Sequence, residues 1–138
     1  MENKFPKQIP VFPLSGVIYF PRTNLPLNIF EERYLNLVKD SFRNDKLMGM
    51  VQSKRENSLV YKVGCLGKIS DFQETSDGRV LINLTGITRF EITKEITSKK
   101  KYREFEVDYK RFYKDLITPN KVEAVYDKIN FMEKVKDF

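Results

Sequence analysis

The sequence predicts a mainly β fold with helices (α+β), in which short strands close on themselves as a small barrel or sandwich. Apolar and polar residues alternate in several runs, the clearest over residues 59–69, and this period is typical of strands with one buried face. An Asp77-Gly78 pair, typical of a hairpin turn, follows that run. Helical spacing of apolar residues occurs in two places only, about residues 28–43 and about residues 119–138.

The composition indicates one ordinary domain. The chain has 138 residues, of which 41% are hydrophobic and 32% charged, so it can bury a core and is too apolar to be disordered. The single cysteine, Cys65, excludes a disulfide scaffold. No apolar run approaches the roughly 20 residues that span a bilayer, so we expect a cytoplasmic protein with no membrane partner.

The absence of histidine narrows the chemistry. Catalytic triads, most zinc sites and most general bases near neutral pH depend on imidazole. We therefore expect no catalytic residue, no metal and no cofactor. Carboxylate-only chemistry stays open, because paired acids in a cleft cannot be recognised from sequence.

The chain begins with segments that contain proline. Residues 9–14 form an apolar run with Pro10 and Pro13, and because proline cannot donate to a central ladder, we expect an edge or bulged strand. A second short run, 17–20, leads to a proline-containing loop over residues 21–26.

The first helix is predicted from about residue 28 to residue 43. Asn28 can cap it, and Glu31 stands where a capping box places its acid. The apolar stripe of this helix comprises Phe30, Tyr34, Leu35, Val38 and Phe42.

The central part of the chain predicts a series of strands. The strand-like segments are residues 47–51, 59–69, 80–84, 90–96 and 105–109. Gly64 and Gly67 indicate a bulge or bend, since their spacing does not fit a phosphate-binding loop. Cys65 falls on the apolar side of its strand and is predicted to be a buried, inert thiol.

The C-terminal residues form a separate part in this prediction. A barrel over residues 1–110 is followed by a linker and the start of a helical part over residues 111–138. The helical pattern reaches residue 138 without a terminating signal, so we expect a truncated helix that continues, or that supports self-association or contact with a protease.

The positive charge raises the question of nucleic-acid binding. The net charge of +6 lies mostly in residues 1–69, and the densest cluster, Lys99–Lys101, stands between two strands, where a solvated hairpin tip explains it. Aromatic residues do not interleave with a basic stripe, so we consider nucleic acid an improbable partner.

Aromatic residues flank the proline-containing loop and suggest two interpretations. They belong either to the core or to a partly open apolar groove beside an edge strand, into which an extended peptide would dock. The candidate peptide-contact surface comprises Tyr19, Phe20, Arg22, Leu25, Phe30 and Tyr34.

An ordered set of short blocks resembles the N-terminal domain of Lon proteases. The blocks are Ile9-Pro10-Val11-Phe12-Pro13-Leu14, Tyr19-Phe20-Pro21, Leu25-Pro26-Leu27-Asn28-Ile29-Phe30-Glu31-Glu32-Arg33-Tyr34, Val63-Gly64-Cys65, Asp77-Gly78-Arg79 and Gly86-Ile87-Thr88-Arg89-Phe90-Glu91-Ile92. Two blocks look most like the small bacterial proteins that carry this domain alone. The family often has glycine where Arg22 stands and histidine where Asn28 stands.

The resemblance implies a PUA-like pseudo-barrel followed by helices. In the full protease this domain selects protein substrates, while separate ATPase and Ser-Lys peptidase modules, which this sequence lacks, do the chemistry. We therefore expect a non-catalytic domain that binds unfolded or extended polypeptide. The alternatives are a PUA-like RNA-binding domain, and a small-ligand pocket or enzyme in the mouth of the barrel.

Overall fold

The computed structural model describes residues 5–15, 19–54 and 60–116. In chain order these form β1 (Gln8–Leu14), β2 (Asn24–Ile29), α1 (Glu32–Arg43), β3 (Leu47–Ser53), β4 (Val60–Glu74), β5 (Val80–Ile96), β6 (Arg103–Asp108) and the 3-10 segment η1 (Lys110–Leu116). The helix predicted over about residues 119–138 lies outside the described residues. Within them, no helix is long and apolar enough to cross a membrane.

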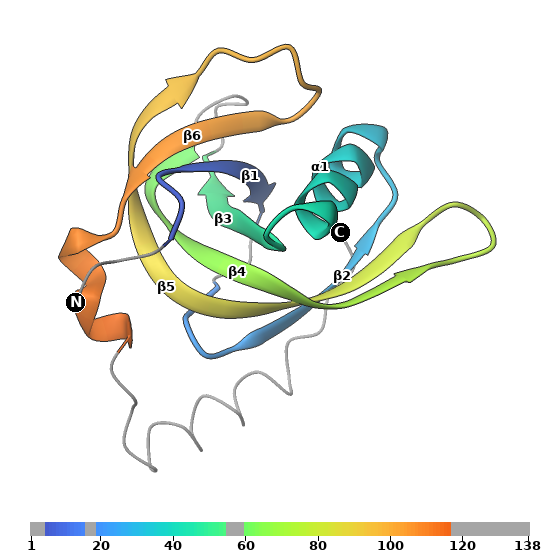
Figure 1. The fold of residues 1–138 in the computed structure, drawn as a ribbon, viewed down its shortest axis with the longest axis horizontal. Coiled ribbons are helices and arrows are strands. Elements are labelled where there is room, and N and C mark those ends of the chain that lie inside the picture. Colours follow the sequence, from blue (N-terminus) through green and yellow to red (C-terminus); the bar gives the residue numbers. More distant parts are fainter. Residues whose placement is uncertain (1–4, 16–18, 55–59, 117–138) are drawn as a thin grey trace.

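The strands close into a ring, as Figure 1 shows. β5 pairs with β4, β4 with β3, β3 with β1, β1 with β6, and β6 again with β5. β1 and β3 are parallel, and the other neighbours in the ring are antiparallel. β2 adds to the N-terminal half of β5. The predicted mainly β, pseudo-barrel fold is confirmed.

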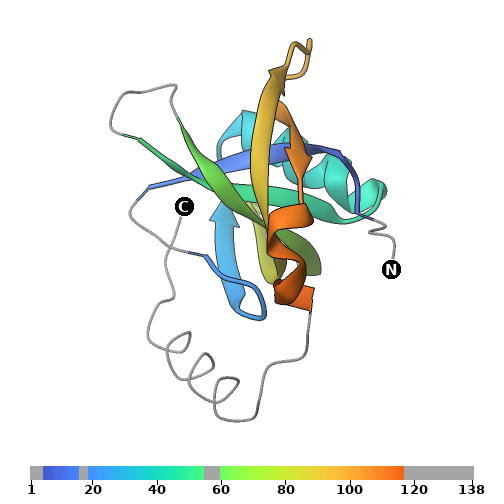
Figure 2. The same ribbon diagram turned by 90° about the vertical axis from the view of Figure 1, so that its left-hand side faces the viewer.

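Two groups of buried side chains fill the interior. One group includes Leu27 of β2 and Leu37 of α1, and the other includes Phe90 of β5 and Phe105 of β6. β1, β4 and β5 contribute residues to both groups, so the same strands join the two halves of the core. α1 packs against β1 and β3 (Figures 1 and 2).

The start of α1 corrects the predicted capping box. The helix begins at Glu32 after Glu31, which makes no side-chain capping hydrogen bond. Asn28 instead lies in β2 opposite Leu81, because pairing with β5 extends that strand through Ile29. The side-chain oxygen of Asn28 is buried and finds no hydrogen-bond partner within the described part of the chain.

The prediction of an edge or bulged strand for residues 9–14 is wrong, because β1 has a neighbour on each side. Its first half pairs with β6 and its second half with β3, and the exchange occurs at Val11. The bond from the Val107 N–H to the Lys7 carbonyl oxygen sets the alternation along the β6 ladder. By that alternation, the nitrogen of Pro10 points to the β3 side of the strand, at a position before the pairing with β3 begins. The nitrogen of Pro13 points to the β6 side, at a position after the pairing with β6 has ended. Neither proline removes a ladder bond.

The segments predicted as strands 80–84 and 90–96 form one strand, β5, which continues through Gly86. The predictions of a turn at Asp77-Gly78 and of a bulge at Gly67 are confirmed. Gly78 adopts a φ of 87° in the turn between β4 and β5, and the ladder between these two strands shifts register at Gly67. The Lys99–Lys101 cluster lies in the connection between β5 and β6.

Part of the predicted linker packs against the barrel. η1 lies on β5 (Figure 2), with Phe112 buried beneath it. The Arg89 guanidinium forms an ion pair with Asp115, at 2.9 Å, and the same carboxylate accepts the backbone N–H of Arg89 at 2.9 Å. Residues 110–116 are therefore held to β5 rather than forming a free connection.

Candidate functional site

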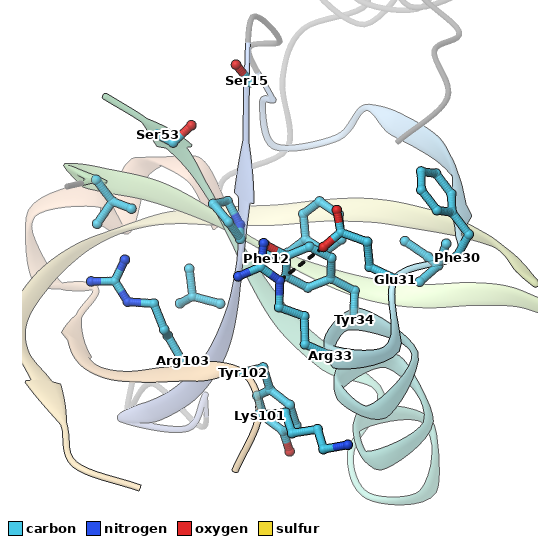
Figure 3. Close-up of a pocket in the computed structure, with 14 residues that line it drawn as sticks. Phe12, Ser15, Phe30, Glu31, Arg33, Tyr34, Ser53, Lys101, Tyr102 and Arg103 are labelled. Atoms are coloured by element: carbon cyan, nitrogen blue, oxygen red, sulfur yellow. Dashed lines mark hydrogen bonds and ion pairs between the residues drawn. The ribbon is translucent and has the colours of Figure 1, made fainter. Parts of the chain in front are cut away.

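An open groove of about 630 Å³ lies where α1 meets the ring of strands. It is formed by β1, the end of β2, the first turn of α1, the facing ends of β3 and β4, and the connection from β5 into β6. The lining residues are Val11, Phe12, Pro13, Ser15, Ile29, Phe30, Glu31, Arg33, Tyr34, Ser53, Val60, Lys101, Tyr102 and Arg103. We call this site the Phe30 groove (Figure 3).

The floor of the Phe30 groove is apolar and fixed by the core. Phe12 and Ile29 are almost fully buried, and the ring of Tyr34 packs on that of Phe12 with a centroid distance of 4.3 Å. Phe30 follows β2 directly, and its side chain is 56% exposed. An exposed aromatic ring beside a buried apolar floor is a surface on which an apolar ligand group can displace water.

Three cationic side chains from different elements line the groove. Arg33 pairs with Glu31 at 3.0 Å, Arg103 pairs with Glu95 at 2.8 Å, and Lys101 pairs with Glu32. These pairs are largely exposed to solvent, and such pairs contribute little to stability.

The ion pairs also shift the titration of the acids beside the groove. The hydrogen bond from Lys101 lowers the pKa of Glu32, and that from Arg103 lowers the pKa of Glu95. Both acids are therefore charged at neutral pH.

Tyr34 joins the apolar and the cationic parts of the groove. Its ring carries the Arg33 guanidinium 4.6 Å from the centroid, a cation–π contact. Burial raises the pKa of Tyr34, so the phenol stays protonated and its O–H is available as a hydrogen-bond donor.

The six residues of the predicted contact surface do not lie together. Phe30 and Tyr34 line the groove, as proposed from the sequence. Leu25 is only 4% exposed and belongs to the core, so its inclusion was wrong: its side chain points inward from β2. Tyr19 packs against the same core, and its hydroxyl donates to the Leu84 carbonyl oxygen at 2.8 Å.

Phe20 and Arg22, the remaining two, belong to a turn outside the groove lining. The Arg22 N–H donates to the Gly86 carbonyl oxygen at 2.9 Å, and the Gly86 N–H donates to the Thr23 carbonyl oxygen at 2.8 Å. A Cβ atom at Gly86 would lie 2.2 Å from the carbonyl oxygen of Phe20, so glycine is required there. The turn is thus tight although arginine stands where the family often has glycine.

The sequence did not predict that the β5–β6 connection and the first residue of β6 line the groove. Lys101, Tyr102 and Arg103 lie far along the chain from Phe30, and Tyr102 reaches α1 with a hydrogen bond to Asp40 of 2.6 Å. Lys99–Lys101 are exposed, as predicted for a solvated tip, but Tyr102 next to them is 5% exposed. An aromatic residue inside a lysine cluster was the available signal.

Outside the groove, the buried thiol is confirmed. Cys65 is 1% exposed, and burial raises its pKa, so it stays a neutral thiol. Among the described residues, no group of three or more His, Cys, Asp or Glu side chains is placed to hold a metal ion.

Comparison with known proteins identifies the same domain from sequence and from structure. The family model of the ATP-dependent protease La (LON) substrate-binding domain matches residues 8–135. The Lon protease of Cytophaga hutchinsonii is 27% identical over 101 residues, covering 69% of this chain and 12% of that protein. The Lon protease of Endomicrobium trichonymphae is 27% identical over 128 residues, covering 88% of this chain and 16% of that protein. The chain thus spans less than a fifth of these relatives.

Two solved structures have a similar fold. A Lon N-terminal domain protein from Xanthomonas campestris superposes with a TM-score of 0.64 and 27% identity, covering 74% of this chain and 59% of that one. The N-terminal domain of a Mycobacterium avium complex Lon protease superposes with a TM-score of 0.59 and 16% identity, covering 75% and 54%, and shows the fold alone. With its closed ring of strands and a family match over most of its length, this chain belongs to the LON substrate-binding domain family.

Proposed function

We propose that this chain is a non-catalytic recognition domain that binds extended or unfolded polypeptide in the Phe30 groove, and that its partner in the cell is an ATP-dependent protease. The observation that carries the proposal is the groove itself. It combines an exposed aromatic ring, Phe30, with a rigid apolar floor and a polar rim in one open site. Open sites of this kind hold a segment of chain without enclosing it.

The proposed mechanism is burial of apolar side chains that a folded client hides and an unfolded client exposes. Covering one large apolar side chain contributes about 1.5–3 kcal/mol before the cost of ordering the ligand. Ordering a flexible chain offsets part of that gain, so we expect modest affinity for a single segment. Weak binding of this kind suits a domain that must release its client.

Backbone pairing with the proline-bearing strand β1 does not contribute to this mechanism. The sequence suggested it as an edge, but β1 pairs with β6 in its first half and with β3 in its second, and the nitrogens of Pro10 and Pro13 point to the unpaired side of each half. Among the described strands β2 pairs with β5 alone, and Pro26 stands in the middle of β2. A proline on an edge strand discourages addition of a further strand. We therefore assign recognition to side chains in the groove.

The test compares a permanently unfolded polypeptide, a disulfide-reduced and alkylated model protein, with the native form of the same protein. We expect fluorescence anisotropy to show binding of the unfolded form only. Phe30→Ala should weaken that binding by about tenfold, corresponding to loss of about 1.4 kcal/mol. Tyr113→Ala is the matched control, because Tyr113 on η1 is 61% exposed and lies outside the groove.

Phe20→Ala tests the wider surface predicted from the sequence. Phe20 is 53% exposed, nearly as much as Phe30, but it does not line the groove. Loss of polypeptide binding in Phe30→Ala but not in Phe20→Ala would assign recognition to the groove. Equal capture of native and unfolded protein, or full binding by Phe30→Ala, would contradict the proposal. Tight binding of single-stranded RNA with a steep salt dependence would favour the RNA-binding alternative.

A further inference from the structure

The rim of the Phe30 groove suggests which polypeptide segments it selects. Building on the polypeptide-binding role proposed above, we propose that the groove prefers extended segments in which a large apolar side chain stands next to a carboxylate. The apolar side chain would cover Phe30, and the carboxylate would face Arg33 and Arg103.

A ligand inside the groove meets more positive than negative side chains. Arg33, Lys101 and Arg103 all line it, whereas Glu31 is the one acid among the lining residues that the structure describes. The acids that pair with Lys101 and Arg103, Glu32 and Glu95, do not line the groove. A ligand carboxylate inside the groove is therefore closer to the cations than to the acids that balance them, and the local field favours an anion.

The existing ion pairs of the groove can exchange partners at little cost in free energy. In the Arg33–Glu31 pair the side chains are 56% and 49% exposed. Ion pairs that are this exposed contribute about 0–1 kcal/mol, so a ligand carboxylate can share or replace the intramolecular partner. The guanidinium group presents several donors, which allows Arg33 to contact both carboxylates.

The apolar and the cationic parts of the groove lie next to each other. In Figure 3 Phe30 lies on one side of the groove and Arg103 on the other, and Tyr34 and Arg33 lie between them. Arg33 stacks on Tyr34, whose ring packs on the buried Phe12. Arg33 is thereby held beside the apolar floor. The groove can therefore bind an apolar group and a carboxylate that belong to neighbouring residues of the ligand.

The experiment uses four fluorescein-labelled peptides of about twelve residues, enough to cross the groove in extended form. Each has the same Gly/Ser scaffold and carries repeated Phe-Glu, Phe-Gln, Phe-Lys or Ala-Glu pairs. At low salt we expect the 138-residue chain to bind the Phe-Glu peptide roughly threefold to tenfold more tightly than the Phe-Gln peptide. The Phe-Lys and Ala-Glu peptides should bind more weakly still. The preference for Glu over Gln should shrink as salt rises, because salt screens exposed charges.

Arg33→Gln tests the assignment to the groove, and Arg111→Gln is its matched control. Arg111 also pairs with an exposed acid, Glu91, at 3.3 Å and also lies over an aromatic ring, that of Phe112. It does not line the groove, and its replacement changes the net charge by the same amount. We expect the preference for Phe-Glu over Phe-Gln to disappear in Arg33→Gln and to persist in Arg111→Gln.

The outcomes separate this inference from the proposed function. If the Phe-Glu and Phe-Gln peptides bind equally and both are lost in Phe30→Ala, the charge preference is overturned while polypeptide binding stands. An equal loss of preference in both arginine variants would also overturn it, because net charge alone would then explain the effect. If none of the four peptides binds, the inference and the proposed function both fail.

Discussion

Arg22 shows how one residue holds a backbone conformation that its side chain disfavours. Its φ is 63°, in the left-handed region that costs a non-glycine residue roughly 1–2 kcal/mol. Two features offset this cost: its N–H bonds the Gly86 carbonyl oxygen, and its guanidinium bonds the Asp115 carbonyl oxygen. The arginine thus gains a contact with η1 that glycine could not make.

The strain at Arg22 predicts an unusual order of stability between two variants. Arg22→Ala and Arg22→Gly both lose the side-chain contact with Asp115, but only glycine relieves the positive φ. We expect Arg22→Gly to be more stable than Arg22→Ala by about 1 kcal/mol in urea unfolding. At Lys39, inside α1, the order should reverse, because glycine disfavours a helix interior. If the glycine and alanine variants had the same order of stability at Arg22 and at Lys39, backbone strain at Arg22 would be contradicted.

At the scale of elements, η1 is held to the barrel by one carboxylate, that of Asp115, whose side chain is 10% exposed. Asp115 accepts bonds from the Arg89 backbone and from both Nε and Nη2 of its guanidinium, at 2.9, 3.0 and 2.9 Å. The guanidinium groups of Arg89 and Arg111 both lie over the ring of Phe112, 4.7 and 5.3 Å from its centroid. Burial would raise the pKa of Asp115, but the bonds from Arg89 outweigh it and lower that pKa overall.

This arrangement predicts a pH-dependent contribution from Asp115. Because its pKa is lower in the folded than in the unfolded chain, its stabilising effect is present above the unfolded pKa of about 4. The effect is lost as pH falls through the lower, folded-state pKa. We expect Asp115→Asn to reduce the free energy of unfolding by about 1–2 kcal/mol at neutral pH and by much less at about pH 2.

Urea unfolding of the unchanged protein and of Asp115→Asn, from neutral to acidic pH, measures the difference in their free energies of unfolding. Asp71→Asn is the control, because Asp71 is exposed on β4, and it should change stability little at any pH. A difference for Asp115→Asn that stays constant with pH would mean that the charge of this carboxylate does not hold η1.

At the scale of the whole molecule, shared strands couple the two core groups. β5 supplies Leu84 to the group beneath α1 and Phe90 to the group beside β6. Because one continuous strand serves both groups, neither can lose its packing without disturbing the backbone of the other. The barrel should therefore unfold as one unit.

Phe90→Ala tests this coupling, since Phe90 is completely buried. We expect a loss of about 3–5 kcal/mol, the usual cost of such a cavity. Hydrogen exchange at Leu27 in β2, which belongs to the other group, should accelerate to the same extent as exchange in β6. Phe20→Ala serves as the control with an exposed ring. Unchanged protection of Leu27 in Phe90→Ala would show that the two groups unfold separately.

The periodic segments and turns of this fold could be predicted from sequence because their causes are local. Residues 60–69 lie in β4, as their alternation predicted, but of the alternating apolar residues Cys65 and Ile69 are buried whereas Tyr61 and Val63 are exposed. Gly78 adopts the turn conformation that its neighbours and its missing side chain favour. Phe30 and Tyr34 were proposed as contact residues because aromatic residues flank the proline-containing loop, and both line the groove.

Where pairing competes with local preference, the sequence prediction failed. Asn28 has the pattern of a helix cap, but the ladder with β5 holds it in β2. Pro10 and Pro13 suggested an edge, but β1 changes partner between them and lies inside the ring. Such outcomes depend on strands that are distant in the chain, which a single segment does not reveal.

The sequence by itself determined the kind of fold, most of its elements and the family, since these follow from local periodicity, turn residues and an ordered set of motifs. Only the tertiary structure decided the site. Closure of β6 onto β1 and β5 brings Arg103 to the groove that Tyr34 of α1 also lines. Leu25 of β2 is instead buried in the core group beneath α1. The reason is physical: a groove is made by side chains that converge from distant segments, and their convergence is set by the register of the ring.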